Sequence, residues 1–222
     1  MGETDQHIGA IIYLRDALRY LLRDDAMAYV AANLMFYYEE GDASAVKAPD
    51  VFVAKGVGRQ SRRTYRLWVE KVAPCVVIEV TSRKTRLEDM GSKRALYEML
   101  GIGEYYLFDP AGEYLSPPLR GYHLVDGQYA PMALGPNGEL HSPALGATLR
   151  PDGERLRVVD PQTGDVVPTH AEAMYRAARE AERAELEATN ARREAERATA
   201  AEAELARLRA EIDRLQGRPP DA

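Results

Sequence analysis

Two carboxylates occupy positions where a nearby cation would be needed to balance them. Glu79 lies in the middle of VVIEVTS, a run of β-branched residues that predicts a buried strand. A buried carboxylate is costly unless it is paired or binds a metal. Asp50 begins a second apolar run, APDVFVA, which predicts a neighbouring strand. Two acids at the ends of adjacent strands repel each other. Mg²⁺ relieves that repulsion, since it prefers one or two carboxylates together with water and phosphate oxygens.

The alternation of side chains along a strand places Glu79 on the same face as Thr81. Both residues are close to the carboxyl end of their strand. In sheets with helical crossovers, ligands bind beyond that end. The alternative for Asp50 and Glu79 is that both are surface or capped acids with a structural role.

A lysine in the helix predicted after Ser82 supplies a third charged group. At 100° per residue, Lys93 falls in the middle of an apolar face, and Asp89 lies on the edge of that face. Lysine is rarely buried without a partner. Its partner is either Asp89, in a structural i,i+4 ion pair, or the carboxylates of the sheet. In the second case the ammonium could orient a water molecule that attacks phosphorus.

The elements that position these residues combine strands with helices. A helix is predicted over YLRDALRYLLRDD, and a second over KTRLEDMGSKRALYEMLGI, with a terminal glycine at Gly101 or Gly103. Strands are predicted in MAYVAANLMFYYEE, VKAPDVFVAKG, APCVVIEVTS and EYYLFDP. A helix between apolar strands indicates a βαβ-like crossover. We therefore expect an α/β (mixed α+β) fold with a central mixed sheet flanked by helices.

Composition changes twice along the chain. Residues 111 to about 168 are rich in turns and predict hairpins that extend or cover the first unit. Thr169-x-x-Glu172 resembles a capping box, and no Gly or Pro follows until Gly217. We expect a domain over 1–168, an Ala/Glu/Arg-rich helix over 169–217 and a disordered tail over 218–222.

The long helix carries a short apolar seam. Leu205, Leu208, Ile212 and Leu215 are spaced 3, 4 and 3 residues apart, which is typical of a coiled coil. Seven-residue steps upstream give Ala198 and Ala201, so the seam weakens in that direction. We expect a homo-oligomer through this helix; a single solvated helix is the alternative.

Composition excludes several classes of protein. The chain has 222 residues, of which 45% are hydrophobic and 29% charged. It contains no apolar run long enough for a membrane span and no signal-peptide pattern. Its single cysteine excludes an internal disulfide and a cysteine zinc site. We expect a cytoplasmic protein with no membrane partner. A net charge of −6 does not favour global attraction to nucleic acid, although residues 55–71 hold six basic residues against one acid.

The motifs together resemble a known family. The sequence is similar to the Uma2 group of endonucleases, within the PD-(D/E)XK nuclease superfamily, over about residues 25–165. The resemblance is carried by YYEEGDASAVKAPDVFVAKGV, VVIEVTSRKTRLEDMGSKRALYEMLGIGEYYLFDP and SPPLRGYHLVDGQY. It implies a restriction-endonuclease-like core and a Mg²⁺-dependent (or Mn²⁺-dependent) endonuclease that hydrolyses phosphodiester bonds of DNA.

The resemblance also implies roles for individual residues. Asp50 matches the aspartate of the PD motif and Glu79 the second acid, so the implied metal ligands are Asp50, Glu79 and Val80. The superfamily's usual lysine would stand at Thr81. Lys93 resembles its substitute from the following helix and would complete the catalytic set, with Lys84 as the competing candidate.

Further residues are candidates for supporting roles. Glu39 or Glu40 could add an acid to the site. The basic segment implies a loop that contacts DNA phosphates, with Tyr65 and Trp68 stacking on bases. The predicted nucleic-acid contacts are Arg59, Arg62, Arg63 and Arg66. The alternative is a solvated basic hairpin whose aromatic residues pack on the core.

A different function remains open from the sequence. Thr81 and the net acidity favour a catalytically inactive nuclease-fold scaffold, or an interaction protein that acts through its coiled coil. The combination of Asp50, Glu79 and Lys93 favours the nuclease.

Overall fold

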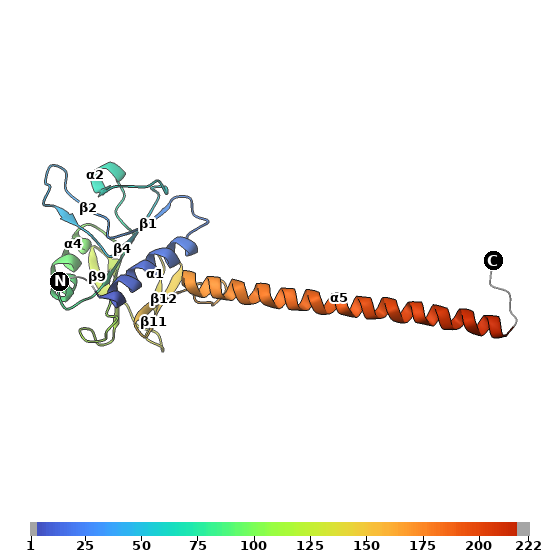
Figure 1. Ribbon diagram of the computed structural model, residues 1–222. Coiled ribbons are helices and arrows are strands. Elements are labelled where there is room, and N and C mark those ends of the chain that lie inside the picture. Colours follow the sequence, from blue (N-terminus) through green and yellow to red (C-terminus); the bar gives the residue numbers. More distant parts are fainter. Residues whose placement is uncertain (1–3, 217–222) are drawn as a thin grey trace. The chain divides into compact units, whose positions relative to one another are not determined.

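A computed structural model describes residues 4–216, so the tail expected over 218–222 lies outside the described residues. The chain divides into two compact units, Met1–Thr169 and His170–Ala222. Figure 1 shows the first as a mixed α/β unit and the second as a long helix. In the described part of the chain, no helix combines the length and apolar character needed to cross a membrane.

A six-stranded mixed sheet forms the centre of the first unit. Its order is β1-β4-β6-β7-β8-β9. The strands are β1 (Ala28–Ala32), β4 (Val51–Lys55), β6 (Val76–Val80), β7 (Glu104–Phe108), β8 (Leu119–Val125) and β9 (Gln128–Pro131). Strands β6 and β7 are parallel, whereas the other neighbours are antiparallel. The expected fold class, with a helical crossover and a central mixed sheet, is therefore confirmed.

One face of the sheet packs against helix α1 (Asp5–Leu21) and a separate three-stranded sheet (Figure 1). That sheet contains β10 (Leu140–Ser142), β11 (Ala147–Asp152) and β12 (Arg155–Val159). The turn-rich region thus both extends the central sheet, through β8 and β9, and covers it. Leu14 and Leu18 of α1 are fully buried in this core, as their helical spacing predicts.

The other face is covered by the crossover and by a small sheet. The small sheet joins β2 (Phe36–Tyr37), β3 (Val46–Lys47) and β5 (Tyr65–Arg66), and helix α2 (Leu67–Glu70) follows β5. The crossover runs through α3 (Arg86–Glu88), the π-helical turn η1 (Asp89–Lys93) and α4 (Arg94–Met99). Gly101, just past α4, has a φ of 73°, a conformation that glycine adopts without strain.

The crossover differs from the expected continuous α-helix at η1. The sequence predicts one continuous α-helix over these residues, but its middle turn is a π-helix. Single π turns occur frequently at functional sites. Both residues at the ends of η1, Asp89 and Lys93, are buried.

The second unit is helix α5 (His170–Leu215), which begins directly after Thr169 of the predicted capping box. At 1.5 Å per residue, its 46 residues span about 70 Å. None of its residues is buried.

Candidate active site

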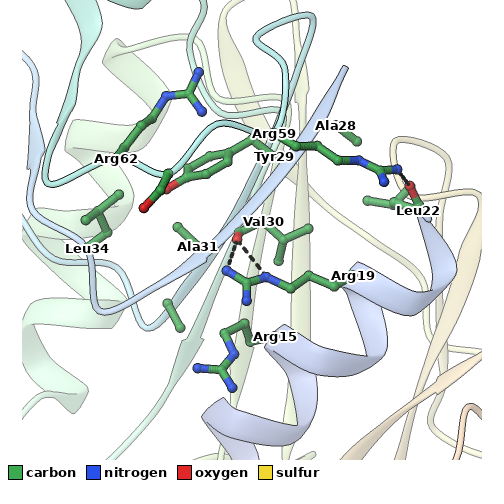
Figure 2. A pocket seen from close by; sticks show the side chains of 12 residues that line it. Arg15, Arg19, Leu22, Ala28, Tyr29, Val30, Ala31, Leu34, Arg59 and Arg62 are labelled. Carbon is green, nitrogen blue, oxygen red and sulfur yellow. Dashed lines mark hydrogen bonds between the residues drawn. The ribbon is translucent and has the colours of Figure 1, made fainter. Parts of the chain in front are cut away.

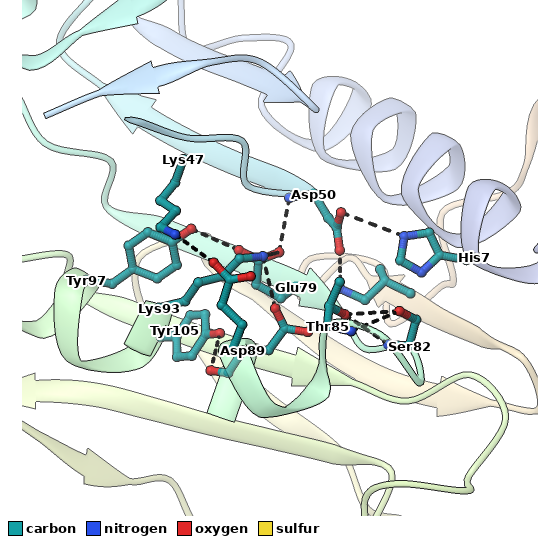
Figure 3. Close-up of polar contacts among 12 residues, drawn as sticks. His7, Lys47, Asp50, Glu79, Ser82, Thr85, Asp89, Lys93, Tyr97 and Tyr105 are labelled. Carbon is teal, nitrogen blue, oxygen red and sulfur yellow. Dashed lines mark hydrogen bonds and ion pairs between the residues drawn. The ribbon is translucent and has the colours of Figure 1, made fainter. Parts of the chain in front are cut away.

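The Glu79 carboxylate is fully buried and is held from three directions (Figure 3). The Tyr97 hydroxyl donates to its Oε1 at 2.9 Å, and the Asp50 amide donates to its Oε2 at 3.3 Å. The Lys93 ammonium lies 3.0 Å from Oε2. Glu79 therefore faces the helical crossover, and its partners come from α4, η1 and the start of β4.

Asp50 stands immediately before β4, where the chain enters the central sheet. Its Oδ2 accepts a hydrogen bond of 2.7 Å from the Val80 amide, and its Oδ1 lies 3.7 Å from Nε2 of His7. Each of the two predicted acids thus accepts a hydrogen bond from a backbone amide at or next to the other acid. Asp50 accepts from the amide of Val80, which follows Glu79, and Glu79 accepts from the amide of Asp50. This reciprocal arrangement holds the ends of β4 and β6 together.

The π turn presents Asp89 and Lys93 to the same point. The Lys93 ammonium lies 2.9 Å from Oδ1 of Asp89, so it is shared between Asp89 and Glu79. The Tyr105 hydroxyl donates to the Asp89 carbonyl at 2.8 Å and thereby fastens η1 to β7. The two partners that the sequence offered as alternatives for Lys93 are therefore both present.

Burial and neighbouring charges shift the pKa values of the groups in this cluster. Burial alone would lower the pKa of Lys93, but Glu79 and Asp89 outweigh it and raise this pKa, so the ammonium stays charged. Burial raises the pKa of Glu79, and Asp50 and Asp89 raise it further, while Lys93 opposes the shift. Two carboxylates thus contact one ammonium, and a cation bound nearby would oppose the rise in the pKa of Glu79.

A pocket of about 560 Å³ opens beside Asp50 and Thr81. His7 of α1, Lys84 and the segment after β7 also line it. Asp109 shapes that segment, because its carboxylate accepts hydrogen bonds from the amides of Ala111, Gly112, Tyr114 and Leu115. Thr81 is 2% exposed, and among residues 4–216 its hydroxyl has no hydrogen-bond partner.

The donor types of Asp50, which lines this pocket, and of Glu79, which is buried behind it, fit a magnesium ion. Mg²⁺ takes one or two carboxylates and completes its shell with water. Asp50 and Glu79 would supply the carboxylates. The Val80 side chain is buried in the core, so only its carbonyl could serve as a ligand. Over residues 4–216, no group of three or more His, Cys, Asp or Glu side chains forms a metal site, so water would provide most of the shell.

The three supporting candidates, Lys84, Glu39 and Glu40, lie at two different places. Lys84 lines the pocket together with Asp50. Glu39 and Glu40 are exposed after the end of β2, and in the described part of the chain no hydrogen bond or ion pair joins Glu40 to Asp50 or Glu79.

Two arginines of the basic segment, residues 55–71, bind other groups of the protein. Arg62 forms a bidentate ion pair with Glu70, at 2.7 and 3.0 Å, and stacks on the Tyr29 ring. Arg59 donates to the carbonyls of Leu22, Arg23 and Asp25 and so caps the chain that leaves α1. Arg63 and Arg66 are exposed.

The expectation that Tyr65 stacks on bases is wrong. Its ring is fully buried against Phe36 and Phe52, and its hydroxyl donates to the Val72 carbonyl at 2.7 Å. Tyr65 is the first of the two residues of β5, and its side chain belongs to the core. Trp68 is half-buried in α2 and lines a shallow pocket with Arg66.

A second pocket, of about 610 Å³, runs along the outer edge of β1 (Figure 2). Four arginines line it, from α1 and from the basic segment: Arg15, Arg19, Arg59 and Arg62. Arg19 binds the Val30 carbonyl through two nitrogens, at 3.0 and 3.3 Å. The lining extends to Leu34, and the adjacent Asn33 amide donates to the Asp50 carbonyl at 3.2 Å. One lining residue of this β1 groove, Leu34, thus directly follows a residue that binds the backbone of Asp50.

Comparison with known proteins places the chain in a family. A family model described as "Uma2: Putative restriction endonuclease" matches residues 2–162. The chain belongs to the Uma2 family. A solved structure titled as a "putative nuclease belonging to DUF820 from Anabaena variabilis ATCC 29413" is 14% identical, with a TM-score of 0.49; the match covers 66% of this chain and 76% of that one. No curated protein matches.

Membership in the Uma2 family confirms the resemblance that the sequence motifs indicated. It makes this chain a member of a nuclease family of the restriction-endonuclease type. The matched residues include Asp50, Glu79, Thr81 and Lys93, and they end before α5. The family match therefore concerns the first unit alone.

Sequence reasoning missed two residues of this Uma2 site, His7 and Tyr97. His7 contacts Asp50 although 43 positions separate them, and no local pattern singles out a histidine near the start of α1. Tyr97 belongs to the same predicted helix as Lys93, but the sequence did not indicate that its hydroxyl binds Glu79. Its position four residues after Lys93 was the available signal.

Proposed function

We propose that this Uma2 protein is a Mg²⁺-dependent endonuclease that hydrolyses phosphodiester bonds of DNA, with Mn²⁺ as an alternative metal. One observation carries the proposal: a buried ammonium, Lys93, lies between the carboxylates of Glu79 and Asp89, and Glu79 accepts a hydrogen bond from the amide of Asp50, which lines a pocket. Buried ionisable groups with strongly shifted pKa values in a cleft are typical of active sites.

In this proposal Asp50 and Glu79 hold the metal, together with the Val80 carbonyl. A bound magnesium ion would supply stabilisation of the charge that develops on the phosphate. Lys93 holds its proton because two carboxylates raise its pKa, so it orients the attacking water as a donor and does not act as a base. Tyr97 and Asp89 keep Glu79 and Lys93 in position.

The basic groups supply candidate contacts to the DNA backbone. Arg63 and Arg66 are exposed and can reach phosphates directly. Arg15 and Arg19 line the β1 groove and contribute positive charge to it. Arg59 and Arg62 already bind protein groups, so in this proposal they shape the groove and contribute charge to it.

A second candidate function is a scaffold without activity. It is favoured by Thr81, which carries no charge where the superfamily has lysine, and by the engagement of Lys93 with two carboxylates. In that reading the Lys93 cluster only stabilises the fold.

Plasmid nicking separates the two functions. Supercoiled DNA is incubated with the full chain and Mg²⁺, Mn²⁺, Ca²⁺ or EDTA, and the nicked fraction is followed over time. We expect nicking with Mg²⁺ or Mn²⁺ and its loss in Glu79→Gln and Lys93→Met, by about 10²-fold or more. Glu88→Gln and Lys55→Met, which change partly or fully exposed groups, serve as matched controls. Equal nicking by all five proteins would point to a contaminant and support the scaffold.

A further inference from the structure

The apolar seam of α5 is exposed along its whole length. Leu205, Leu208, Ile212 and Leu215 retain between 50% and 75% of their surface. They follow one side of a helix whose other residues are mostly Ala, Glu and Arg. Four large apolar side chains in a single stripe favour a partner of matching shape, because exposed contiguous apolar surface is unfavourable in water.

The spacing assigns each seam residue to a heptad position. Leu205 and Ile212 occupy a positions, and Leu208 and Leu215 occupy d positions. The same register places Ala198 at a and Ala201 at d. The seam therefore fits a second helix that carries the same repeat.

The charges beside the seam identify that second helix. The g positions hold Arg197, Glu204 and Glu211, and the e positions hold Glu202 and Arg209. In a parallel, in-register pair, each g residue faces the e residue five positions later on its partner. Arg197 then meets Glu202, and Glu204 meets Arg209, so both contacts join opposite charges.

The antiparallel arrangement lacks this complementarity. When two such seams overlap in opposite directions, g positions face g positions. Both g residues that flank the apolar seam, Glu204 and Glu211, are acidic and would face glutamates. Like charges at these positions disfavour pairing.

We propose that the seam of α5 binds the α5 of a second copy of this chain in a parallel, in-register coiled coil centred on Leu205–Leu215. The two helices then run in the same direction, so the first units of both copies are attached at the same end of the coiled coil. This proposal stands independently of the proposed nuclease function, because it rests on α5 alone.

Sedimentation equilibrium of the full chain tests the pairing. We expect a dimer that dissociates on dilution, and a monomer for the variant with both Leu208→Lys and Ile212→Lys. The matched control is Leu186→Lys, which changes an exposed leucine of the same helix outside the a and d positions. Far-UV circular dichroism verifies that α5 remains helical. A wild-type monomer at ~100 μM, far above the dissociation constant expected of a specific dimer, or equal dissociation constants for wild type and the double-lysine variant, would overturn the proposal.

A charge swap tests the direction of pairing. In the parallel arrangement, Glu204→Arg faces Arg209 and should raise the dimer dissociation constant about tenfold. Adding Arg209→Glu should restore it. In the antiparallel arrangement, Glu204→Arg relieves a contact between glutamates, so tighter dimerisation of the single variant would contradict the parallel model.

Discussion

The ammonium group of Lys93 lies 3.0 Å from the carboxylate of Glu79, although the two side chains leave a π turn and a β-strand that are separate elements. Glu79 is fully buried and Lys93 nearly so. The same ammonium contacts Asp89 at 2.9 Å. Lys93 thus joins the π turn to β6, and Glu79 in turn accepts a hydrogen bond from the amide of Asp50.

Removal of the Lys93 charge should destabilise the fold strongly. In Lys93→Met the carboxylates of Glu79 and Asp89 lose their buried partner, and we expect a loss of about 3–5 kcal/mol in the free energy of unfolding. Adding Glu79→Gln should recover about 1 kcal/mol or more, because one uncompensated buried acid is gone. Urea unfolding followed by the fluorescence of Trp68, the single tryptophan, measures both values. A loss below about 1 kcal/mol in Lys93→Met would show that this ion pair contributes little.

Thr81→Val should separate stability from activity. The Thr81 hydroxyl is buried without a hydrogen-bond partner in the described part of the chain, and it lines the pocket. Its replacement by a methyl group should therefore leave the free energy of unfolding unchanged or raise it by about 1 kcal/mol. If the hydroxyl binds water or phosphate during the reaction, the nicking rate should fall about fivefold. Reduced stability in this variant would mean that the hydroxyl is paired in the folded state.

Low pH should weaken the ion pair between Arg62 and Glu70. The hydrogen bond from Arg62 lowers the pKa of Glu70 below its ordinary value. The folded state therefore binds this proton less readily than the unfolded state, so the contribution to stability is present above the ordinary glutamate pKa of about 4.3 and is lost as pH falls through the lowered pKa. At pH 7, Glu70→Gln should be less stable than wild type by about 1–2 kcal/mol.

The difference between wild type and Glu70→Gln should shrink as the pH falls below about 4. Urea unfolding at several pH values measures it, and Glu40→Gln, at an exposed turn, is the control. A difference that stays constant down to about pH 3 would exclude Glu70 ionisation as its source.

The β1 groove should contribute to nucleic-acid affinity through charge. With EDTA present to prevent cleavage, fluorescence anisotropy gives the dissociation constant for labelled duplex DNA at several salt concentrations. The variant with both Arg15→Gln and Arg19→Gln should bind more weakly. It should also lower the slope of log affinity against log salt by about two, one for each arginine that no longer neutralises a phosphate.

Arg23→Gln is the matched control for this experiment, because Arg23 follows α1, lies over the Tyr20 ring and does not line the groove. Equal slopes for wild type and the double variant would exclude Arg15 and Arg19 as phosphate-binding residues while leaving the proposed catalysis untouched.

Much of the framework could be predicted because it depends on local patterns. The β-branched run around Glu79, the apolar spacing of Leu14 and Leu18 and the uninterrupted helix after Thr169 each reflect a periodicity that short-range physics enforces. The π turn could not be predicted in this way, since 100° per residue assumes an α-helix. Tyr65 was misjudged because its charged neighbours resemble a solvated loop, whereas packing against Phe36 and Phe52 decides its position.

The sequence by itself determined which residues could do chemistry: a carboxylate in a buried strand, an acid at the start of its neighbour and a lysine on an apolar helix face. Only the tertiary structure decided how they meet. It set the register of β4 against β6, so that Asp50 and Glu79 bind each other's backbone, and it brought His7 from α1 to Asp50. It also turned Lys93 toward two acids at once. The physical reason is that a buried charge acquires its partner through contacts between elements distant in the chain, and no local sequence pattern encodes those contacts.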